Sequence, residues 1–194
     1  YWDRSAEDTK DKYMGNITDG ADLYDFEGYK IYRATDFEFN DAYNITDGDG
    51  NPTFLEPYVQ NGVRAQWDLI DGKSGWHPVD LNGIKFYLGD ETGLVHSYVD
   101  NNVVNGQRYY YAVVSYDYGG DLTNNIIPSD SPMKLRVNPL TGAVSLGPNV
   151  VEVVPSPPSA GFVDASFTGD QIDHVAGASS LSLIHISEPT RPLY

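Results

Sequence analysis

Residues 109–116, which read YYYAVVSY, constrain the fold more than any other segment of the chain. Aromatic and β-branched side chains favour strands, and the Asn105-Gly106 pair ahead of this segment is typical of a turn. Successive side chains of a strand point to opposite faces, so Tyr109, Tyr111 and Val113 share one face. Both faces are largely apolar, which predicts a central strand.

A second strand is predicted at residues 27–34, EGYKIYRA. Tyr29 and Ile31 share one face while Lys30 and Tyr32 point the other way, a pattern typical of a half-buried strand. Glycine and proline recur throughout the chain, and no long segment repeats apolar residues with the helical period, so helices should be few and short. The sequence predicts an all-β fold. Shorter strands are expected at 94–99, 133–137 and 150–154, with Trp2 at the end of another.

The charge balance limits the classes of partner. The 194 residues include 12 Lys and Arg against 28 Asp and Glu, a formal net charge of −16. Such a chain repels phosphate backbones, so nucleic acid is excluded as a partner. No stretch approaches 18 uninterrupted apolar residues, so membrane insertion is not expected. With no cysteine, the chain has neither disulfides nor Cys-type zinc sites.

The order of these segments resembles the fibronectin type III family. The resemblance lies in Trp2-Asp3, then DFEGYKIYR, then LVHSYVDNNVVNGQRYYYAVVSYD, then SPMKLRV. It implies an immunoglobulin-like antiparallel β-sandwich, entered at its second strand, with Trp2 ending strand B and Tyr109 as the "tyrosine corner" before strand F. The structural residues implied are Trp2, Tyr29, Ile31, Tyr109, Tyr111 and Val113.

The likeness is closest to modules of large exported bacterial proteins and implies an extracellular or cell-surface location. Residues 1–137 would form the sandwich without its first strand and with an insertion at about 35–93. The Pro-, Gly- and Ser-rich residues 138–180 are expected to be a linker and the start of a following module, whose strand at 150–154 would lack a partner. Residues 181–191, LSLIHISEPTR, resemble a translated sequencing adapter, so 181–194 are expected to be an artefact.

One acidic turn in the insertion is a candidate calcium site. Its candidate ligands are Asp47, Asp49, Asn51 and Glu56 in TDGDGNPTFLE. Alternate oxygen side chains on a Gly-rich turn suit a hard cation. Pro52 departs from the EF-hand loop pattern. An ordinary Asp-Gly turn accounts for the same residues.

Aromatic residues in the same insertion are candidate ligand contacts. Trp67 and Trp76 could stack on sugar rings or anchor a protein ligand. The alternative is that they pack with Phe86 and Tyr87 as a small core over the sandwich.

No catalytic motif is present, so the chain is not expected to be an enzyme and needs no cofactor. It has no nucleophile elbow, zinc-protease helix, phosphate-binding loop or dinucleotide fingerprint. The leading hypothesis is a structural or interaction module that spaces neighbouring domains of the same chain or contributes to adhesion. The alternatives are a carbohydrate-binding module and an accessory domain of an extracellular polysaccharide-degrading enzyme or protease.

Overall fold

The computed structural model describes residues 1–10, 24–42, 44–120, 125–133 and 135–161. Within these residues the protein is all-β, with antiparallel sheets and no helix, as the sequence predicts. Tyr1–Ser156 form one compact unit, and the chain from Pro157 onward forms a second. The adapter-like residues 181–194 lie outside the described part of the chain.

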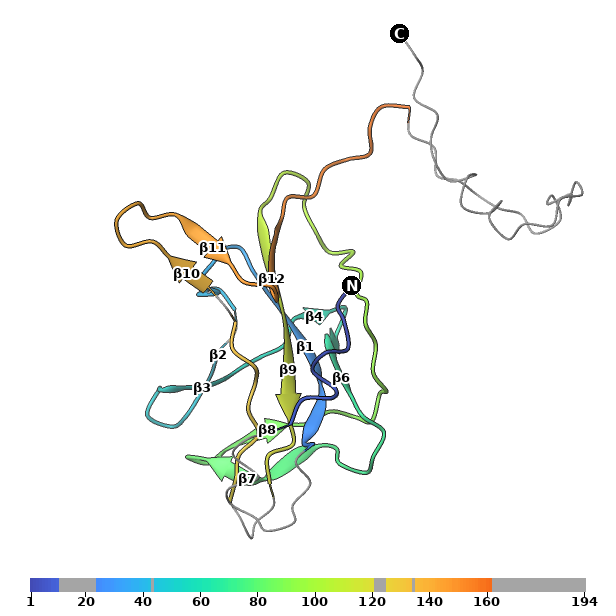
Figure 1. Ribbon diagram of the computed structural model, residues 1–194, viewed down its shortest axis with the longest axis vertical. Coiled ribbons are helices and arrows are strands. Elements are labelled where there is room, and N and C mark those ends of the chain that lie inside the picture. Colours follow the sequence, from blue (N-terminus) through green and yellow to red (C-terminus); the bar gives the residue numbers. More distant parts are fainter. Residues whose placement is uncertain (11–23, 43, 121–124, 134, 162–194) are drawn as a thin grey trace, which may run out of the picture. The chain divides into compact units, whose positions relative to one another are not determined.

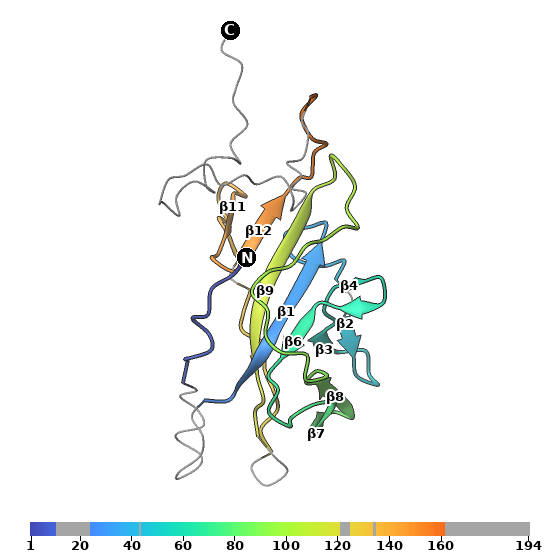
Figure 2. The same ribbon diagram turned by 90° about the vertical axis from the view of Figure 1, so that its right-hand side faces the viewer.

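A four-stranded antiparallel sheet organises the first unit (Figure 1). Its strands are β1 (Phe26–Ala34), β6 (Gln66–Asp68), β9 (Tyr109–Asp117) and β12 (Val150–Val153), in the order β12-β9-β1-β6. The two nine-residue strands β1 and β9 lie side by side at its centre, as Figure 2 shows. They pair from Phe26 opposite Asp117 to Ala34 opposite Tyr110, which confirms both of the main predicted strands.

Eight shorter strands form four two-stranded ribbons. These are β2 (Asn44–Thr46) with β3 (Pro52–Leu55), β4 (Val59–Gln60) with β5 (Val63–Arg64), β7 (Trp76–Leu81) with β8 (Ile84–Tyr87), and β10 (Leu135–Val137) with β11 (Val144–Leu146).

One face of the sheet, here called the hairpin face, packs against the β2–β3, β7–β8 and β10–β11 ribbons. The buried residues on it form the main core with Phe39, and half-buried residues from β3, β10 and β11 pack against them. A second cluster forms where Phe86 and Leu88 meet Tyr116. The buried residues of the main core are Tyr32, Ala34, Phe39, Tyr110, Ala112, Val114 and Val150.

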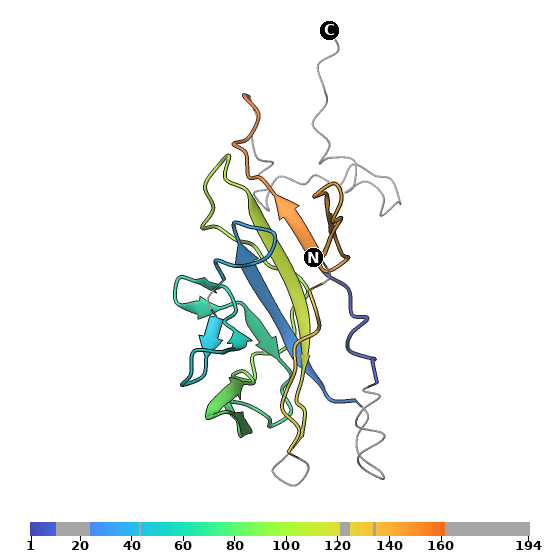
Figure 3. The same ribbon diagram turned by 90° about the vertical axis from the view of Figure 1, so that its left-hand side faces the viewer.

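The opposite face, here called the Tyr29 face, carries the residues that the family resemblance predicts to be structural. Tyr29, Ile31 and Tyr109 are buried, whereas Tyr111 and Val113 are half-buried. The N-terminal segment lies on this side of the sheet, across from the β2–β3 and β7–β8 ribbons (Figures 2 and 3). Its anchor is a half-buried tryptophan, Trp2, whose ring lies 5.8 Å from that of Tyr29.

Strand β1 is more deeply buried than its alternating sequence predicts. Every residue from Glu27 to Tyr32 is buried, including Lys30 on the side expected to face water. The reason is the segment 35–93, which was expected to be an insertion outside the sheet. It supplies the edge strand β6 and two of the ribbons over the hairpin face, β2–β3 and β7–β8.

Two shorter predictions were wrong. Residues 94–99 form no strand, and Trp2 lies outside every strand. The backbone of the two segments is nevertheless joined, because the Trp2 amide donates to the His96 carbonyl over 3.1 Å. The strand predicted at 133–137 is confirmed over Leu135–Val137, which form β10.

The strand predicted at residues 150–154 was expected to belong to a following module and to lack a partner. It instead completes the main sheet. β12 pairs with β9 from Val150 opposite Ala112 to Val153 opposite Tyr109. Val150 is buried in the core, while Val151 and Val153 remain exposed at the edge of the sheet. The compact unit therefore continues to Ser156, beyond the predicted linker boundary at residue 138.

Gly28 is required where β1 meets β6. A Cβ atom at this position would lie 2.2 Å from the Trp67 carbonyl oxygen and 2.8 Å from the Tyr116 hydroxyl. We expect Gly28→Ala to lower the free energy of unfolding by about 2 kcal/mol, because overpacking forces the paired strands apart. Urea unfolding measures the loss. The matched control is Gly48→Ala, since no atom lies within 4 Å of the added methyl; equal losses in the two variants would contradict the β1–β6 packing.

Candidate functional site

A buried lysine lies at the centre of the hairpin face. Lys30 extends from β1, and only 4% of its side chain is exposed. Its Nζ lies 3.6 Å from the centre of the Phe86 ring and 4.7 Å from that of Tyr116. Ammonium groups over aromatic faces are attracted to the ring electrons, but burial at this depth still favours the neutral amine. Burial lowers the pKa of Lys30, against the opposing effect of Asp130.

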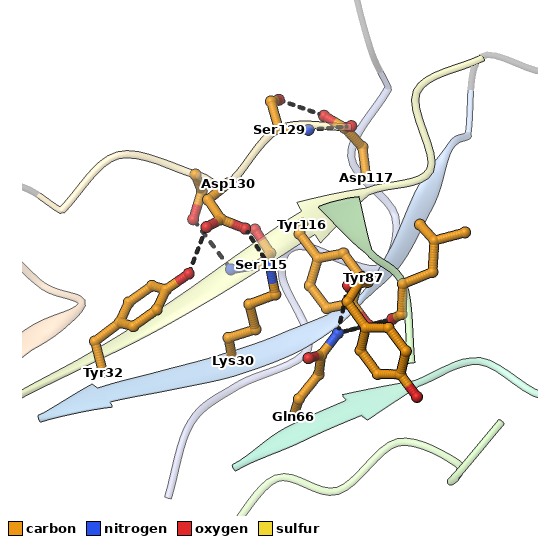
Figure 4. Close-up of polar contacts among 11 residues, drawn as sticks. Lys30, Tyr32, Gln66, Tyr87, Ser115, Tyr116, Asp117, Ser129 and Asp130 are labelled. Atoms are coloured by element: carbon orange, nitrogen blue, oxygen red, sulfur yellow. Dashed lines mark hydrogen bonds and ion pairs between the residues drawn. The ribbon is translucent and has the colours of Figure 1, made fainter. Parts of the chain in front are cut away.

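Asp130 joins this lysine to a tyrosine. Its Oδ1 lies 3.1 Å from Lys30 Nζ, and its Oδ2 accepts a hydrogen bond of 2.5 Å from the Tyr32 hydroxyl. Figure 4 shows both side chains pointing toward Asp130. Burial and the carboxylate both raise the pKa of Tyr32, so its hydroxyl remains a proton donor. We call Lys30, Tyr32 and Asp130 the lysine centre.

Hydrogen bonds on both sides fix Asp130 against strand β9. On one side, Ser129 donates to Asp117 from its amide over 2.8 Å and from its hydroxyl over 2.6 Å. On the other, the Ser131 amide donates to the Ser115 carbonyl over 2.7 Å, and the Ser131 hydroxyl accepts from the Ser115 amide over 3.0 Å. Figure 4 shows this arrangement around the carboxylate. Asp130 is therefore held in place by its neighbours.

The buried side-chain amide of Gln66 lies beside the Tyr116 ring that contacts the Lys30 amine. Gln66 Nε2 donates to the Leu88 carbonyl over 2.8 Å and to the Tyr87 carbonyl over 3.0 Å. The Tyr116 hydroxyl bonds to the same Leu88 carbonyl, and Gln66 Nε2 lies 3.1 Å from this hydroxyl. These contacts tie β6, β8 and β9 together around the Lys30 amine.

A second unusual group lies at the start of β1. Glu27 is fully buried, and neither of its carboxylate oxygens has a hydrogen-bond partner among the described residues. Burial, reinforced by the charge of Asp71, raises the pKa of Glu27 to about 8. Lys73 opposes this shift, while Asp68 adds to it. Glu27 is therefore largely a neutral acid at pH 7.

Neighbouring Asp68 is equally buried but fully bonded. Its Oδ2 accepts from the Glu91 amide over 2.6 Å, and its Oδ1 accepts from the Thr92 amide and hydroxyl, each over 2.8 Å. These bonds anchor residues 91–92 to the end of β6. The Asp68 carboxylate is therefore held by hydrogen bonds, whereas the Glu27 carboxyl has none among the described residues.

Three of the candidate calcium ligands lie in one turn, where backbone amides of the turn donate hydrogen bonds to the Asp47 carboxylate. Asp47 Oδ1 accepts from the Asp49 amide over 3.0 Å and from the Asn51 amide over 2.9 Å. Glu56 instead pairs with Arg64 over 2.7 Å. In the described part of the chain, no three His, Asp or Glu side chains are grouped to hold a metal ion. Calcium binding at Asp47, Asp49, Asn51 and Glu56 stays a prediction.

The two candidate ligand tryptophans lie in different environments. Trp67 is half-buried on the Tyr29 face, with its ring 5.9 Å from Trp2 and 5.6 Å from Tyr98. Trp76 is 58% exposed and lies 5.0 Å from the ring of Tyr87. Only Trp76 therefore presents a large open aromatic surface.

The two histidines of the described β unit contact groups from distant segments. His77 is fully buried, and its ring nitrogens contact the backbone oxygens of Val79 and Gly120. His96 Nε2 lies 2.5 Å from a carboxylate oxygen of Glu7. Both imidazoles serve to hold segments of the chain together.

An open groove of about 790 Å³ runs along the Tyr29 face. Trp2, Tyr29, Tyr111, Val113 and Val151 contribute much of its lining. The groove lies where the predicted sandwich would place its second sheet, but it holds no charged group from the sheet strands.

The sequence did not predict that Lys30, Tyr32 and Asp130 form a site. Lys30 reads as the polar side of a half-buried strand, and Asp130 lies 100 residues away in a segment without a recognisable motif, where the structure shows an isolated β-bridge to Tyr116. No family model, curated protein or solved structure matches the chain. In the described residues no helix is long and apolar enough to cross a membrane.

Proposed function

We propose that this chain is a non-catalytic structural module of fibronectin type III kind, from a secreted or cell-surface bacterial protein, which spaces neighbouring domains of the same chain. The observation that carries the proposal is the antiparallel sheet order β12-β9-β1-β6. Its two central strands are the segments that the family resemblance assigns to the middle of one sandwich sheet. Such a sheet gives a rigid body that can hold neighbouring domains at fixed positions.

The tyrosine at the start of β9 supports the family assignment. The Tyr109 hydroxyl accepts a hydrogen bond of 3.0 Å from the amide of Val104, five residues earlier. A tyrosine corner requires such a bond to the backbone a few residues upstream. The Trp2–His96 backbone contact also lies where the B strand would meet its neighbour in the second sheet.

The charged groups of the sheet support a structural role. Arg33 pairs with Asp100 over 2.8 Å, and the same carboxylate oxygen accepts from the Tyr111 hydroxyl over 2.8 Å. Burial of Asp100 would raise its pKa, but these bonds and that from the Asn102 amide lower it below the usual range. The acid therefore stays ionised as an anchor, and a catalytic acid or base would need a free proton or lone pair.

A spacer must hold its ends at a fixed separation, which electron paramagnetic resonance can measure. The chain has no cysteine, so spin labels at Tyr1→Cys and Ser156→Cys are the only reactive thiols. Both positions are exposed and lie in the same compact unit. We expect a single narrow distance distribution. A broad distribution in a protein whose circular dichroism shows an intact sheet would contradict the spacer role.

Exposed Trp76 beside half-buried Tyr87 favours carbohydrate binding as a second candidate function. Tyr87 bonds through its hydroxyl to Asp90, and the Arg64 guanidinium lies 4.9 Å from the Tyr87 ring. An open aromatic ring beside fixed polar groups can stack on a sugar and bond its hydroxyls. This site lies on the β7–β8 ribbon and its surroundings, within the segment 35–93.

The two tryptophans give a matched test of this candidate. If glycans bind, Trp76→Ala should abolish binding on a glycan array without changing the melting temperature, because the ring is exposed. Trp67→Ala should instead lower the free energy of unfolding by about 1–2 kcal/mol, because it removes a half-buried ring from the Tyr29 face. Absence of glycan binding by the folded wild-type chain would exclude the carbohydrate role and leave the spacer role untouched.

A further inference from the structure

The lysine centre combines the features required for an amine to attack a carboxyl group. The amine and the carboxyl group lie in contact, with Lys30 Nζ 3.1 Å from Asp130 Oδ1. Reacting groups held at such distances gain a large effective concentration relative to free groups in water. The hydrogen bonds of Ser129 and Ser131 keep the carboxyl group from turning away. The proximity of the two groups is therefore already provided.

The environment also favours the reactive form of the amine. Lys30 is enclosed by Phe86 and Tyr116, and burial disfavours its charged form. In such surroundings a proton can pass from the ammonium group to the carboxylate, which leaves a neutral amine beside a neutral acid. A neutral amine is a nucleophile, whereas an ammonium group is not.

The hydroxyl of Tyr32 lies where negative charge would develop. It donates to Asp130 Oδ2, which would carry that charge when the amine adds to Cγ. A donor already placed on this oxygen stabilises the tetrahedral intermediate without reorganisation. Tyr32 is thus suited to act as the oxyanion donor.

We propose that Lys30 and Asp130 condense to form an intramolecular amide bond that joins strand β1 to the segment after β9. The Nζ–Cγ bond forms and one Cγ–O bond of Asp130 breaks. Of the three ammonium protons, one remains on the amide nitrogen and two leave with the departing oxygen as water. Ammonium and carboxylate together equal amide plus water, so the step needs neither oxidant nor cofactor.

Water has a route out of the centre. The Asp130 side chain is 22% exposed, although Lys30 is almost fully buried. Asp130 also lines an open pocket of about 280 Å³ together with Tyr116 and Ser131. The departing water can therefore reach solvent on the carboxyl side.

The bond would close a large loop. Residues 30 and 130 are separated by 100 positions, so the link would span most of the compact unit. A cross-link over so long a loop strongly restricts the unfolded chain. This suits a spacer without disulfides, but the bond is tested independently of that role.

Intact mass spectrometry of the full chain, folded and then denatured, tests the proposal. We expect the wild-type mass to be lower than the sequence mass by one water molecule, and digestion to yield one branched peptide that contains Lys30 and Asp130. The variants Lys30→Arg and Asp130→Ala should keep their full sequence masses. Tyr32→Phe should form the bond more slowly.

The chain contains its own control pair. Lys73 Nζ lies 3.0 Å from Asp71, close to the separation in the lysine centre, but its side chain is 40% exposed. Peptides containing this pair should remain unlinked. A folded wild-type chain that keeps its full sequence mass after prolonged incubation would overturn the proposal, and so would equal linking of the Lys73–Asp71 pair.

Discussion

Replacing Asp130 with alanine is expected to lower the free energy of unfolding by about 3–5 kcal/mol, because it leaves a buried amine without its partner. Lys30 has a side chain only 4% exposed, so water cannot replace the lost carboxylate. The Tyr32 hydroxyl loses its acceptor in the same step. Urea unfolding of the variant and the wild type, followed by circular dichroism, measures the difference.

An exposed ion pair supplies the control for this substitution. Arg108 and Glu152 lie 3.2 Å apart with side chains 59% and 38% exposed. Glu152→Ala should change the free energy of unfolding by less than about 1 kcal/mol, since solvent screens exposed pairs. A loss at Asp130 no larger than the loss at Glu152 would mean that the lysine centre does not stabilise the sheet.

Replacing Glu27 with glutamine is expected to stabilise the protein above neutral pH by about 1–3 kcal/mol, because the variant has no buried acid to ionise. The wild-type carboxyl is fully buried, and its oxygens lack hydrogen-bond partners among the described residues. Glutamine preserves the shape of the side chain without adding a charge beside Asp68 and Asp71.

The pH profile follows from the direction of the Glu27 shift. Burial raises the pKa of Glu27 from 4.5 to about 8, so between these values the folded state binds a proton that the unfolded state releases. The stability contributed by this group is complete below about pH 4.5, falls as the pH rises, and is lost above about pH 8. The variant lacks this decline, so its advantage should grow from pH 5 to pH 8.

Urea unfolding at pH 5, 6, 7 and 8 measures this advantage directly. Glu152→Gln is the exposed control and should show no pH-dependent gain. If Glu27→Gln is less stable than the wild type by the same amount at every pH, Glu27 is ionised in the folded state and the account of its burial is wrong.

The centre of the fold is predictable from the sequence because its signals are local. The segments of β1 and β9 are rich in aromatic and β-branched side chains, and both form strands. Residues 94–99 have a similar composition but form no strand. Strand formation there depends on a pairing partner, which local composition does not specify.

Burial of the hairpin face is not predictable in the same way. Alternation in β1 correctly separates Tyr29 and Ile31 from Lys30 and Tyr32, but it cannot say what covers each side. Two of the covering ribbons, β2–β3 and β7–β8, come from the segment 35–93, and the third, β10–β11, comes from residues 135–146. The short strands of all three carry weak individual patterns. Their position over the sheet depends on contacts between residues distant in sequence.

The lysine centre illustrates the same limit for a candidate site. A lysine between two apolar-patterned positions normally indicates a solvent-facing residue. Only the combination of the covering ribbons and a carboxylate 100 positions away turns Lys30 into a buried, paired amine. The one available signal was Tyr32 on the same face, an aromatic residue that suggests burial of that side.

The central claim is that Val150–Val153 completes a four-stranded antiparallel sheet built on β1 and β9. Hydrogen exchange of the full chain, resolved by residue, tests it most directly. We expect the slowest amide exchange in β1 and β9, with clear protection in β12 compared with residues 159–161. Exchange in β12 as fast as in residues 159–161, while β9 stays protected, would contradict the sheet on which the proposed module depends.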